Sequence, residues 1–338
     1  MVKITSKEKI ITSFKGRHVI SIRDFKKEEL DLILDQAEIL EKIPRAEKCK
    51  ILDGYHLGII FYEPSTRTKI SFTRAADTLG MKWEGIADPK TSSASKGETL
   101  RDTVRNLVGY EFDALVIRHN DDGSVRRASE YSHYPNKHLE FPGEPIPILN
   151  GGDGSNQHPT QTMLDLYTIK ESQGTMDSLT YLFHNDLKNG RTIHSLAEAL
   201  LLYQPKKVYF CSSSRLKMPR HIISKYKKSD IEFEEVSRYE DVLPEVDILY
   251  DTRPQLEREN FTDDLKERIK SMYRIRAHTI KEKAKESMKI MHPLPRNQNL
   301  MSPEEECDDL PQAYYFKQAH NGLFVRQALL CLVKGVSF

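Results

Sequence analysis

The stretch LGIIFYEPSTRTKISF, residues 57–72, decides the fold class of this chain. Its first six residues form an apolar run with the length of a buried strand, and Glu63-Pro64 ends that run. A helical pattern follows from about Ser65 to Leu79. Comparable apolar runs recur at 114–117, 146–149, 180–183, 207–211, 247–250 and 289–291. Because helical stretches separate most of these runs, the sequence predicts βαβ units and parallel sheets.

Domain organisation follows from the length and from one glycine-rich segment. A chain of 338 residues is expected to form two domains of about 100–200 residues each. The segment NGGDGSNQHP at 150–159 is the predicted seam, with a long helix after it. We predict an α/β fold of two doubly wound domains with parallel sheets, joined by long helices. One domain comprises residues 1–158 with a C-terminal helix at about 319–338, and the other comprises residues 159–318.

The composition excludes several classes of protein. The 51 Lys and Arg residues balance 50 Asp and Glu residues, whereas a duplex-DNA binder needs surplus cations. No apolar run approaches the roughly 18 residues of a membrane span, and the N-terminus lacks the apolar core of a secretory signal. Four dispersed cysteines without a CxxC pair are typical of a reducing compartment. We expect a cytoplasmic protein with neither a nucleic-acid nor a membrane partner.

The residues just after the apolar runs are the candidate site, because ligands of open α/β sheets bind at the carboxyl ends of strands. After the first run, Ser65, Thr66, Arg67 and Thr68 place hydroxyls, a guanidinium and free backbone N–H groups at one helix N-terminus. Such an end is partly positive and binds phosphate. On this motif alone, a Ser/Thr helix cap with a solvent-exposed arginine is the simpler interpretation.

The other strand ends favour the anion site. Arginines follow five of the runs, namely Arg67, Arg118, Arg191, Arg253 and Arg296. His158 and Gln161, three residues apart at a predicted helix start, face one ligand unless the histidine is only a cap. A pocket for a small, multiply anionic ligand explains these residues better than five separate surface charges. The sequence has no GxxxxGK[ST], GxGxxG, HExxH or GxSxG motif, so we predict catalysis by positioning and electrostatics, with no cofactor and no metal.

These motifs resemble those of a known family. FYEPSTRT fits the signature F-x-E-x-S-T-R-T, and GDGSNQHPTQTMLDLYTI, DLKNGRTIHSL, DILYDTRPQLER, HPLPR and AHNGLFVRQALL follow in the family's order. From about residue 15 to the C-terminus, the chain is similar to the catalytic chains of the aspartate carbamoyltransferase family, within the aspartate/ornithine carbamoyltransferase superfamily. Ornithine-specific relatives carry HCLP where this chain has HPLP, and they carry an SMG motif that is not found here. The resemblance therefore implies aspartate as the amino-acid substrate.

The resemblance implies a role for each candidate residue. It assigns the phosphate of carbamoyl phosphate to Ser65, Thr66, Arg67 and Thr68, and the carbamoyl oxygen to Thr68, Arg118 and His158. It assigns the carbamoyl nitrogen to Gln161 and to the backbone of Leu294 and Pro295. It assigns the aspartate carboxylates to Arg191, Arg253 and Gln255. The first predicted domain would bind carbamoyl phosphate, and the second would bind aspartate.

The resemblance also implies a reaction and an assembly. Transfer of the carbamoyl group to L-aspartate would give N-carbamoyl-L-aspartate and phosphate, an early step of pyrimidine synthesis. Family members form homotrimers with shared active sites, and the segment KTSSASKGETL would send Ser92 and Lys96 into the neighbouring subunit's site. There both would bind carbamoyl phosphate, and Lys96 would also bind aspartate. Thr73, Asn297–Asn299 and the longer stretch 132–145 depart from the family's pattern and leave open whether a separate regulatory chain binds. The alternatives are a carbamoyltransferase for another amino acid or amine, and an inactive structural or regulatory paralogue.

Overall fold

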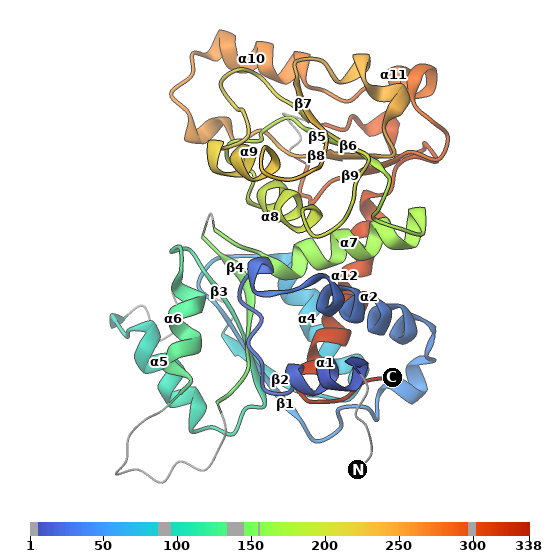
Figure 1. Ribbon diagram of the computed structural model, residues 1–338. Coiled ribbons are helices and arrows are strands. Elements are labelled where there is room, and N and C mark those ends of the chain that lie inside the picture. The colour runs from blue at the N-terminus through green and yellow to red at the C-terminus, as the bar shows by residue number, and fades with distance from the viewer. Residues whose placement is uncertain (1–5, 87–95, 134–144, 155, 297–301) are drawn as a thin grey trace. The chain divides into compact units, whose positions relative to one another are not determined.

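A computed structural model describes residues 6–86, 96–133, 145–154, 156–296 and 302–338 of the chain. Two units are present, each with its own sheet (Figure 1). The first unit comprises Met1–Met163 with Gly322–Phe338, and the second unit comprises Leu164–Asn321. Among the described residues, no helix combines the length and the apolar character needed to cross a membrane.

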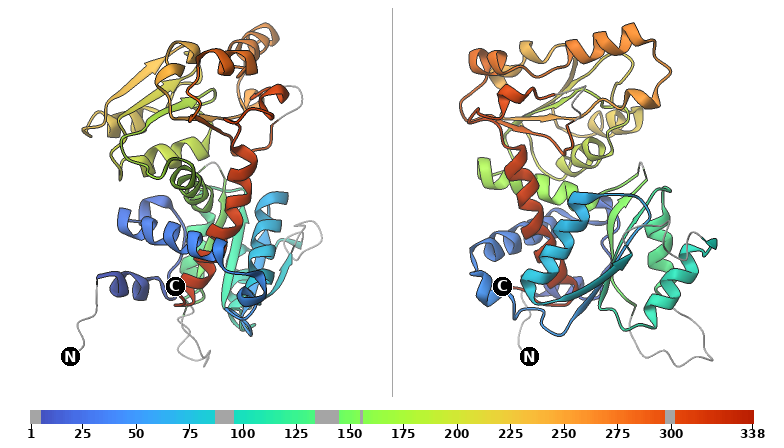
Figure 2. Two further views of the ribbon diagram at one scale, coloured as in Figure 1. Left: turned by 90° about the vertical axis from the view of Figure 1, so that its right-hand side faces the viewer. Right: turned by 180° about the vertical axis from the view of Figure 1, so that it is seen from behind.

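The sheet of the first unit has four parallel strands in the order β2-β1-β3-β4. The strands are β1 (His56–Phe61), β2 (Lys82–Ile86), β3 (Ala114–His119) and β4 (Ile148–Asp153). The helices are α1 (Ser6–Phe14), α2 (Lys27–Lys42), α3 (Arg45–Lys48), α4 (Thr66–Leu79), α5 (Leu100–Val108) and α6 (Ser124–Tyr131). Helices α5 and α6 cover one face, whereas α4 and the end of α12 (Tyr315–Val333) cover the other (Figures 1 and 2). Because both faces are covered, β1 and β3 are continuous apolar runs and do not alternate.

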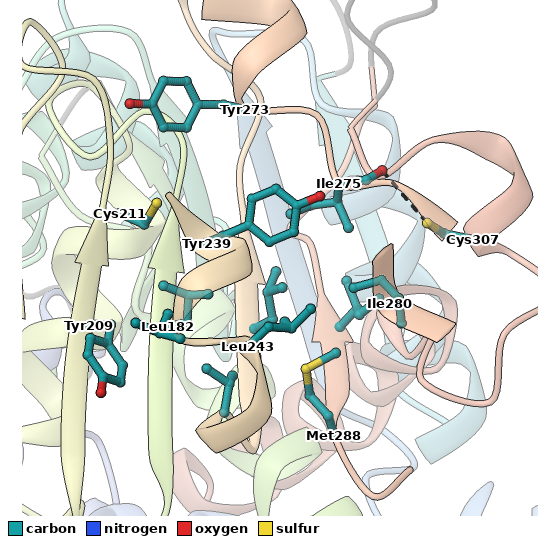
Figure 3. Packing of buried hydrophobic residues seen from close by; sticks show 14 of the residues in the cluster. Leu182, Tyr209, Cys211, Tyr239, Leu243, Tyr273, Ile275, Ile280, Met288 and Cys307 are labelled. Carbon is teal, nitrogen blue, oxygen red and sulfur yellow. Dashed lines mark hydrogen bonds between the residues drawn. The ribbon is translucent and has the colours of Figure 1, made fainter. Parts of the chain in front are cut away.

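The sheet of the second unit has five parallel strands in the order β7-β6-β5-β8-β9. The strands are β5 (Thr180–His184), β6 (Lys207–Cys211), β7 (Phe233–Val236), β8 (Ile248–Asp251) and β9 (Lys289–Met291). The helices are α8 (Arg191–Leu200), α9 (Arg220–Tyr226), α10 (Asp263–Met272) and α11 (Ala277–Lys283). Figure 3 shows a buried cluster of this unit, in which Leu182, Tyr239, Leu243 and Ile280 pack together. The Cys307 thiol lies 3.8 Å from the Ile275 carbonyl oxygen in the same cluster.

Two long helices carry the chain between the units. Helix α7 (Pro159–Gln173) contains the boundary between Met163 and Leu164, and α12 contains the boundary between Asn321 and Gly322. Within the second unit, buried Asp165 of α7 accepts hydrogen bonds from Gln318 of α12 at 2.7 Å and from the Tyr250 hydroxyl at 2.8 Å. These bonds fix the two helices to β8 in that unit.

The predicted fold class is confirmed, because both sheets are parallel and are flanked by helices. The sequence missed β2 and β7, each of which is one of the two edge strands of its sheet. Their sequences, KWEGI and FEEV, contain no apolar run, and their described side chains are half-buried or exposed, unlike most of those of the edge strands β4 and β9. Strand β4 also extends further into the glycine-rich seam than predicted. A Cβ on Gly152 would lie 2.3 Å from a guanidinium nitrogen of Arg118, so only glycine fits beside that side chain.

Candidate active site

The first candidate residues lie at the N-terminus of α4. Ser65 precedes the helix with an extended backbone (φ −157°), and its side chain makes no capping hydrogen bond. The partial positive charge of this helix end is therefore not satisfied by its own cap. Thr66 and Arg67 are exposed, whereas Thr68 is buried. Partial burial lowers the pKa of the Arg67 guanidinium from its ordinary value, although an arginine remains charged at neutral pH.

Strand pairing brings Arg118 beside this helix end. Arg118 of β3 is the register partner of Phe61, the last residue of β1, and its carbonyl accepts the Tyr62 N–H at 2.8 Å. Its buried guanidinium donates to the Gly151 carbonyl at 3.0 Å and lies 2.9 Å from a carboxylate oxygen of Glu63. Burial lowers the pKa of Arg118, and the Glu63 carboxylate partly opposes that effect. The guanidinium is thus held between two strand ends.

The start of α7 places His158 against the same helix end. The Thr68 hydroxyl lies 3.4 Å from His158 Nε2, and the Thr160 hydroxyl lies 3.4 Å from His158 Nδ1. All three side chains are buried. Gln161 lies one turn further along, and its backbone N–H donates to the His158 carbonyl at 2.9 Å. The structure therefore brings residues that follow β1 and β4 together with Arg118 near the end of β3, at the carboxyl end of the sheet.

The sequence did not identify Arg326 of α12 as part of this cluster. Its buried guanidinium donates to the Ser71 hydroxyl at 2.8 Å and to the Thr160 hydroxyl at 3.4 Å, and it stacks over the Phe72 ring at 5.1 Å. Through Thr160, this arginine supports the histidine ring. A single arginine inside the apolar pattern NGLFVRQALLCLV is the signal that could have indicated it.

In the second unit, the segments after β5 and β8 are bonded to each other. Buried Asp186 accepts the Gln255 backbone N–H at 2.8 Å and the Asn189 backbone N–H at 2.9 Å. The Gln255 side-chain amide in turn donates to the Asn189 carbonyl at 2.8 Å. Arg191, the first residue of α8, follows in the same segment. Candidate residues from two neighbouring strands thus share one hydrogen-bonded frame.

Arg253 is already paired with a carboxylate. Its two terminal nitrogens donate to the two oxygens of Glu257 at 3.2 and 2.6 Å. Partial burial tends to raise the pKa of Glu257, but the hydrogen bond and charge of Arg253 outweigh it and lower that pKa below its ordinary value. The pair shows that this guanidinium binds a carboxylate through both nitrogens, which is the geometry expected for a substrate carboxylate.

The segment after β9 carries the remaining candidates. The Leu294 N–H donates to His292 Nδ1 at 2.8 Å, and Pro295 follows. Arg296 pairs with Asp308 through two hydrogen bonds of 2.6 and 2.8 Å and lies over the Tyr315 ring at 4.8 Å. Arg296 therefore has a structural role in the pair with Asp308, whereas the sequence grouped it with four other arginines as part of an anion-binding pocket.

The segment assigned to a neighbouring subunit is described only in part. Lys96 is exposed, whereas Ser92 lies outside the described residues, as do Asn297–Asn299. Thr73, which departs from the family's pattern, is buried, and its hydroxyl donates to the Ile70 carbonyl at 2.9 Å. Within the described part of the chain, no three His, Cys, Asp or Glu side chains are grouped to hold a metal ion.

Two parallel sheets with arginines and hydroxyls at the ends of their strands are typical of α/β proteins that bind small anions. Residues 17–171 match the family model described as aspartate/ornithine carbamoyltransferase, carbamoyl-P binding domain. Residues 177–333 match the model described as aspartate/ornithine carbamoyltransferase, Asp/Orn binding domain. The chain belongs to the aspartate/ornithine carbamoyltransferase family.

Individual relatives cover nearly the whole chain. The aspartate carbamoyltransferase catalytic subunit of Chromobacterium violaceum is 44% identical over 94% of this chain and 97% of its own. The subunit of the same name from Methanocaldococcus jannaschii is 43% identical over 93% and 96%. A crystal form of the M. jannaschii catalytic subunit has a TM-score of 0.83 at 41% identity, covering 94% of this chain and 97% of that one. Trypanosoma cruzi aspartate transcarbamoylase in complex with carbamoyl phosphate has a TM-score of 0.84 at 32% identity, covering 97% and 98%.

Proposed function

We propose that this chain is the catalytic chain of an aspartate carbamoyltransferase. It transfers the carbamoyl group of carbamoyl phosphate to the amino group of L-aspartate, which gives N-carbamoyl-L-aspartate and phosphate, an early step of pyrimidine synthesis. The observation that carries the proposal is the Thr68–His158 contact of 3.4 Å at the N-terminus of α4, in a chain of this family. The names of the relatives at 43–44% identity support aspartate as the acceptor.

In this proposal, the first unit binds carbamoyl phosphate. Its phosphate accepts hydrogen bonds from the first turn of α4, where Ser65, Thr66, Arg67 and Thr68 combine hydroxyls, a cation and backbone N–H groups. The carbamoyl oxygen accepts from Thr68, Arg118 and His158. Donors aimed at an oxyanion typically contribute about 2.7–4 kcal/mol each to the transition state. Gln161 holds the carbamoyl nitrogen, and the backbone of Leu294 and Pro295, which belong to the second unit, also contacts it.

The second unit binds aspartate. Arg191, Arg253 and Gln255 take its two carboxylates, and the existing pair of Arg253 with Glu257 supports this role. A substrate carboxylate replaces that of Glu257 on the guanidinium. This exchange costs little, because exposed ion pairs contribute only about 0.2–1 kcal/mol.

The chemistry needs positioning more than a dedicated base. The neutral α-amino group attacks the carbonyl carbon, and a tetrahedral oxyanion forms and collapses with departure of phosphate. The leaving phosphate accepts the amine proton. Cationic side chains offset the repulsion between two anionic reactants, and alignment of the reactants lowers the barrier by at most about 7–11 kcal/mol.

One assay tests the proposal against its alternatives. The purified chain is supplied with carbamoyl phosphate and, in parallel, aspartate, ornithine and related amines, and each carbamoylated product is quantified. Aspartate is expected to be the preferred acceptor by at least 100-fold. A preference for another amine would identify a carbamoyltransferase of different specificity. Failure to bind carbamoyl phosphate in calorimetry would identify an inactive paralogue.

We also propose a homotrimer in which Ser92 and Lys96 complete the neighbouring subunit's site. The exposure of Lys96 is compatible with this role. Mixing inactive Arg67→Ala and Lys96→Ala subunits is expected to restore part of the activity in hybrid trimers, whereas no recovery in trimers of confirmed size would contradict shared sites. Binding of a separate regulatory chain and location in the cytoplasm stay predictions.

A further inference from the structure

One buried carboxylate links two segments at the carboxyl edge of the second unit's sheet. His184 and Asp251 are the last residues of β5 and β8 and are register partners in the sheet. His184 Nδ1 lies 2.7 Å from Asp251 Oδ1, and both side chains are fully buried. The Ser302 hydroxyl, also buried, donates to Asp251 Oδ2 at 2.7 Å. None of these three side chains takes part in the proposed chemistry.

The chemistry of this group fixes its donors and acceptors. An ionised carboxylate only accepts, so the hydrogen lies on His184 Nδ1 and on the Ser302 hydroxyl. A carboxylate removed from water is costly unless donors satisfy it, and here each oxygen has one. His184 Nε2 has no hydrogen-bond partner among the described residues, and the ring packs against Tyr239 and Tyr273 at 5.1 and 5.7 Å. Such a desolvated set of bonds favours a single arrangement of its side chains.

The position of the group relates it to the aspartate residues. Two residues beyond each member of the His184–Asp251 pair lie Asp186 and Arg253, where Asp186 accepts the Gln255 N–H at 2.8 Å. Two hydrogen-bonded contacts thus join the ends of β5 and β8. One is the His184–Asp251 pair at the last residues of the strands, and the other is the Asp186–Gln255 bond just after them. Ser302, which comes after β9 in the chain, connects a third segment to this group. Its hydroxyl also accepts the Ile275 N–H at 3.1 Å.

We propose that Asp251, through His184 and Ser302, is a positioning residue that holds Arg253 and Gln255 in register for the carboxylates of aspartate. This inference rests on the proposed function. Arg253 must leave Glu257 and meet a substrate carboxylate with both nitrogens, so a small rotation of the strand end costs one of the two bonds. Residues that bind the phosphate of carbamoyl phosphate lie in the first unit, and in the second unit only the backbone of Leu294 and Pro295 is assigned to this substrate, so its affinity depends less on this group.

The test is Asp251→Asn. An amide has one acceptor oxygen in place of two, and its NH2 group can only donate, so one of the two present donors loses its acceptor on residue 251. The KM for aspartate is expected to rise about tenfold, whereas the Kd of carbamoyl phosphate, measured without aspartate, changes less than twofold. Tyr181→Phe is the matched control, because it removes one buried hydrogen bond of 2.9 Å at the opposite end of the same strand β5. Its KM for aspartate is expected to stay unchanged even if stability falls.

Several outcomes overturn the inference. An Asp251→Asn protein that folds and keeps the wild-type KM for aspartate contradicts it, and so does an equal loss of affinity for both substrates. If Asp251→Asn does not fold, Ser302→Ala removes the bonds of the Ser302 hydroxyl to Asp251 and from the Ile275 N–H and leaves the His184–Asp251 pair. That variant is expected to raise the KM for aspartate about threefold, and an unchanged value overturns the inference. A wild-type chain without aspartate-dependent activity contradicts the proposed function instead, so the two failures are distinguishable.

Discussion

Arg67 of the first unit and Arg253 of the second unit differ in whether a carboxylate of the protein already pairs with them. In the first unit, Arg67 is exposed at an uncapped helix end, and no carboxylate in the described ranges pairs with it. In the second unit, Arg253 is held by both oxygens of Glu257 at 3.2 and 2.6 Å. Arg118 of the first unit lies 2.9 Å from Glu63, so the difference concerns Arg67 and Arg253. Under the proposed function, a phosphate would meet Arg67 without displacing a carboxylate, whereas aspartate would displace Glu257 from Arg253.

This difference separates two tasks. Thr68 and His158 are buried and in contact, so their geometry is set before a ligand arrives. Preorganised donors of this kind act on the transition state and therefore on kcat. Under the proposed function, Arg253 would exchange the Glu257 carboxylate for one of aspartate, so it would give modest net affinity and act on the KM for aspartate. Changes in the first unit should thus affect the rate, and changes in the second should affect aspartate affinity.

The largest effect is expected for Arg67→Lys. Lysine keeps the charge but loses the planar fork that binds two phosphate oxygens, so kcat should fall about 100- to 1,000-fold. Steady-state kinetics at saturating substrates measure this loss. Arg74→Lys on the same helix is the control, because Arg74 forms only an exposed pair with Asp77 at 3.2 Å. Near-normal kcat in Arg67→Lys would contradict the proposed preorganisation.

Acid is expected to lower the stability of the first unit through protonation of His18. Burial, followed by the charge of His133, lowers the pKa of His18 to about 4, and its Nδ1 accepts the Ile148 N–H at 3.0 Å. The folded state favours the neutral ring. This stabilisation is therefore complete above pH about 6.5 and is lost as the pH falls towards 4, to a limit of about 3 kcal/mol.

Urea unfolding at pH 7 and pH 4.5 measures this acid effect. The fluorescence of Trp83, the sole tryptophan, reports on β2 of the first unit. His18→Asn retains an acceptor that does not titrate, so it should lose less stability on acidification than the wild type. His278→Asn, at an exposed position, is the control and should follow the wild type. Identical pH dependence in all three proteins would remove His18 as the cause.

A smaller effect is expected for Arg253→Lys in the second unit. Loss of the two-nitrogen contact should raise the KM for aspartate about tenfold, because a single ammonium replaces a bidentate guanidinium. The Kd of carbamoyl phosphate, measured by calorimetry, should stay within twofold of the wild type. Arg258→Lys, at an exposed position five residues further on, is the control. A large loss of kcat at saturating aspartate would break the separation of tasks between the two units.

The smallest effect is expected for Glu257→Gln, and it has the opposite sign. Removal of the competing carboxylate should lower the KM for aspartate about two- to fivefold, which matches the strength of an exposed ion pair. Kinetics at low aspartate detect this gain. Glu267→Gln, which breaks an exposed pair with Lys270 on α10, is the matched control. An increased KM would show that Glu257 assists aspartate binding and does not compete with it.

Local patterns predicted most of the secondary structure. Apolar runs such as 180–183 and 207–211 lie in β5 and β6, which are interior strands of their sheet, because a strand buried on both faces needs apolar residues throughout. Edge strands β2 and β7 were missed, since these half-exposed strands carry charged residues and their sequences therefore resemble those of loops. The motif STRT likewise indicated an anion-binding helix end, because that property depends on adjacent residues.

The sequence by itself determined the two α/β sheets, the family and a set of candidate residues at the strand ends. Only the tertiary structure decided which of them touch. Thr68 and His158 are 90 residues apart, His184 and Asp251 are 67 apart, and Arg326 and Thr160 are 166 apart. Hydrophobic periodicity is a property of neighbouring residues, whereas these contacts depend on strand order and on which helix covers which face. Packing of the whole chain sets both.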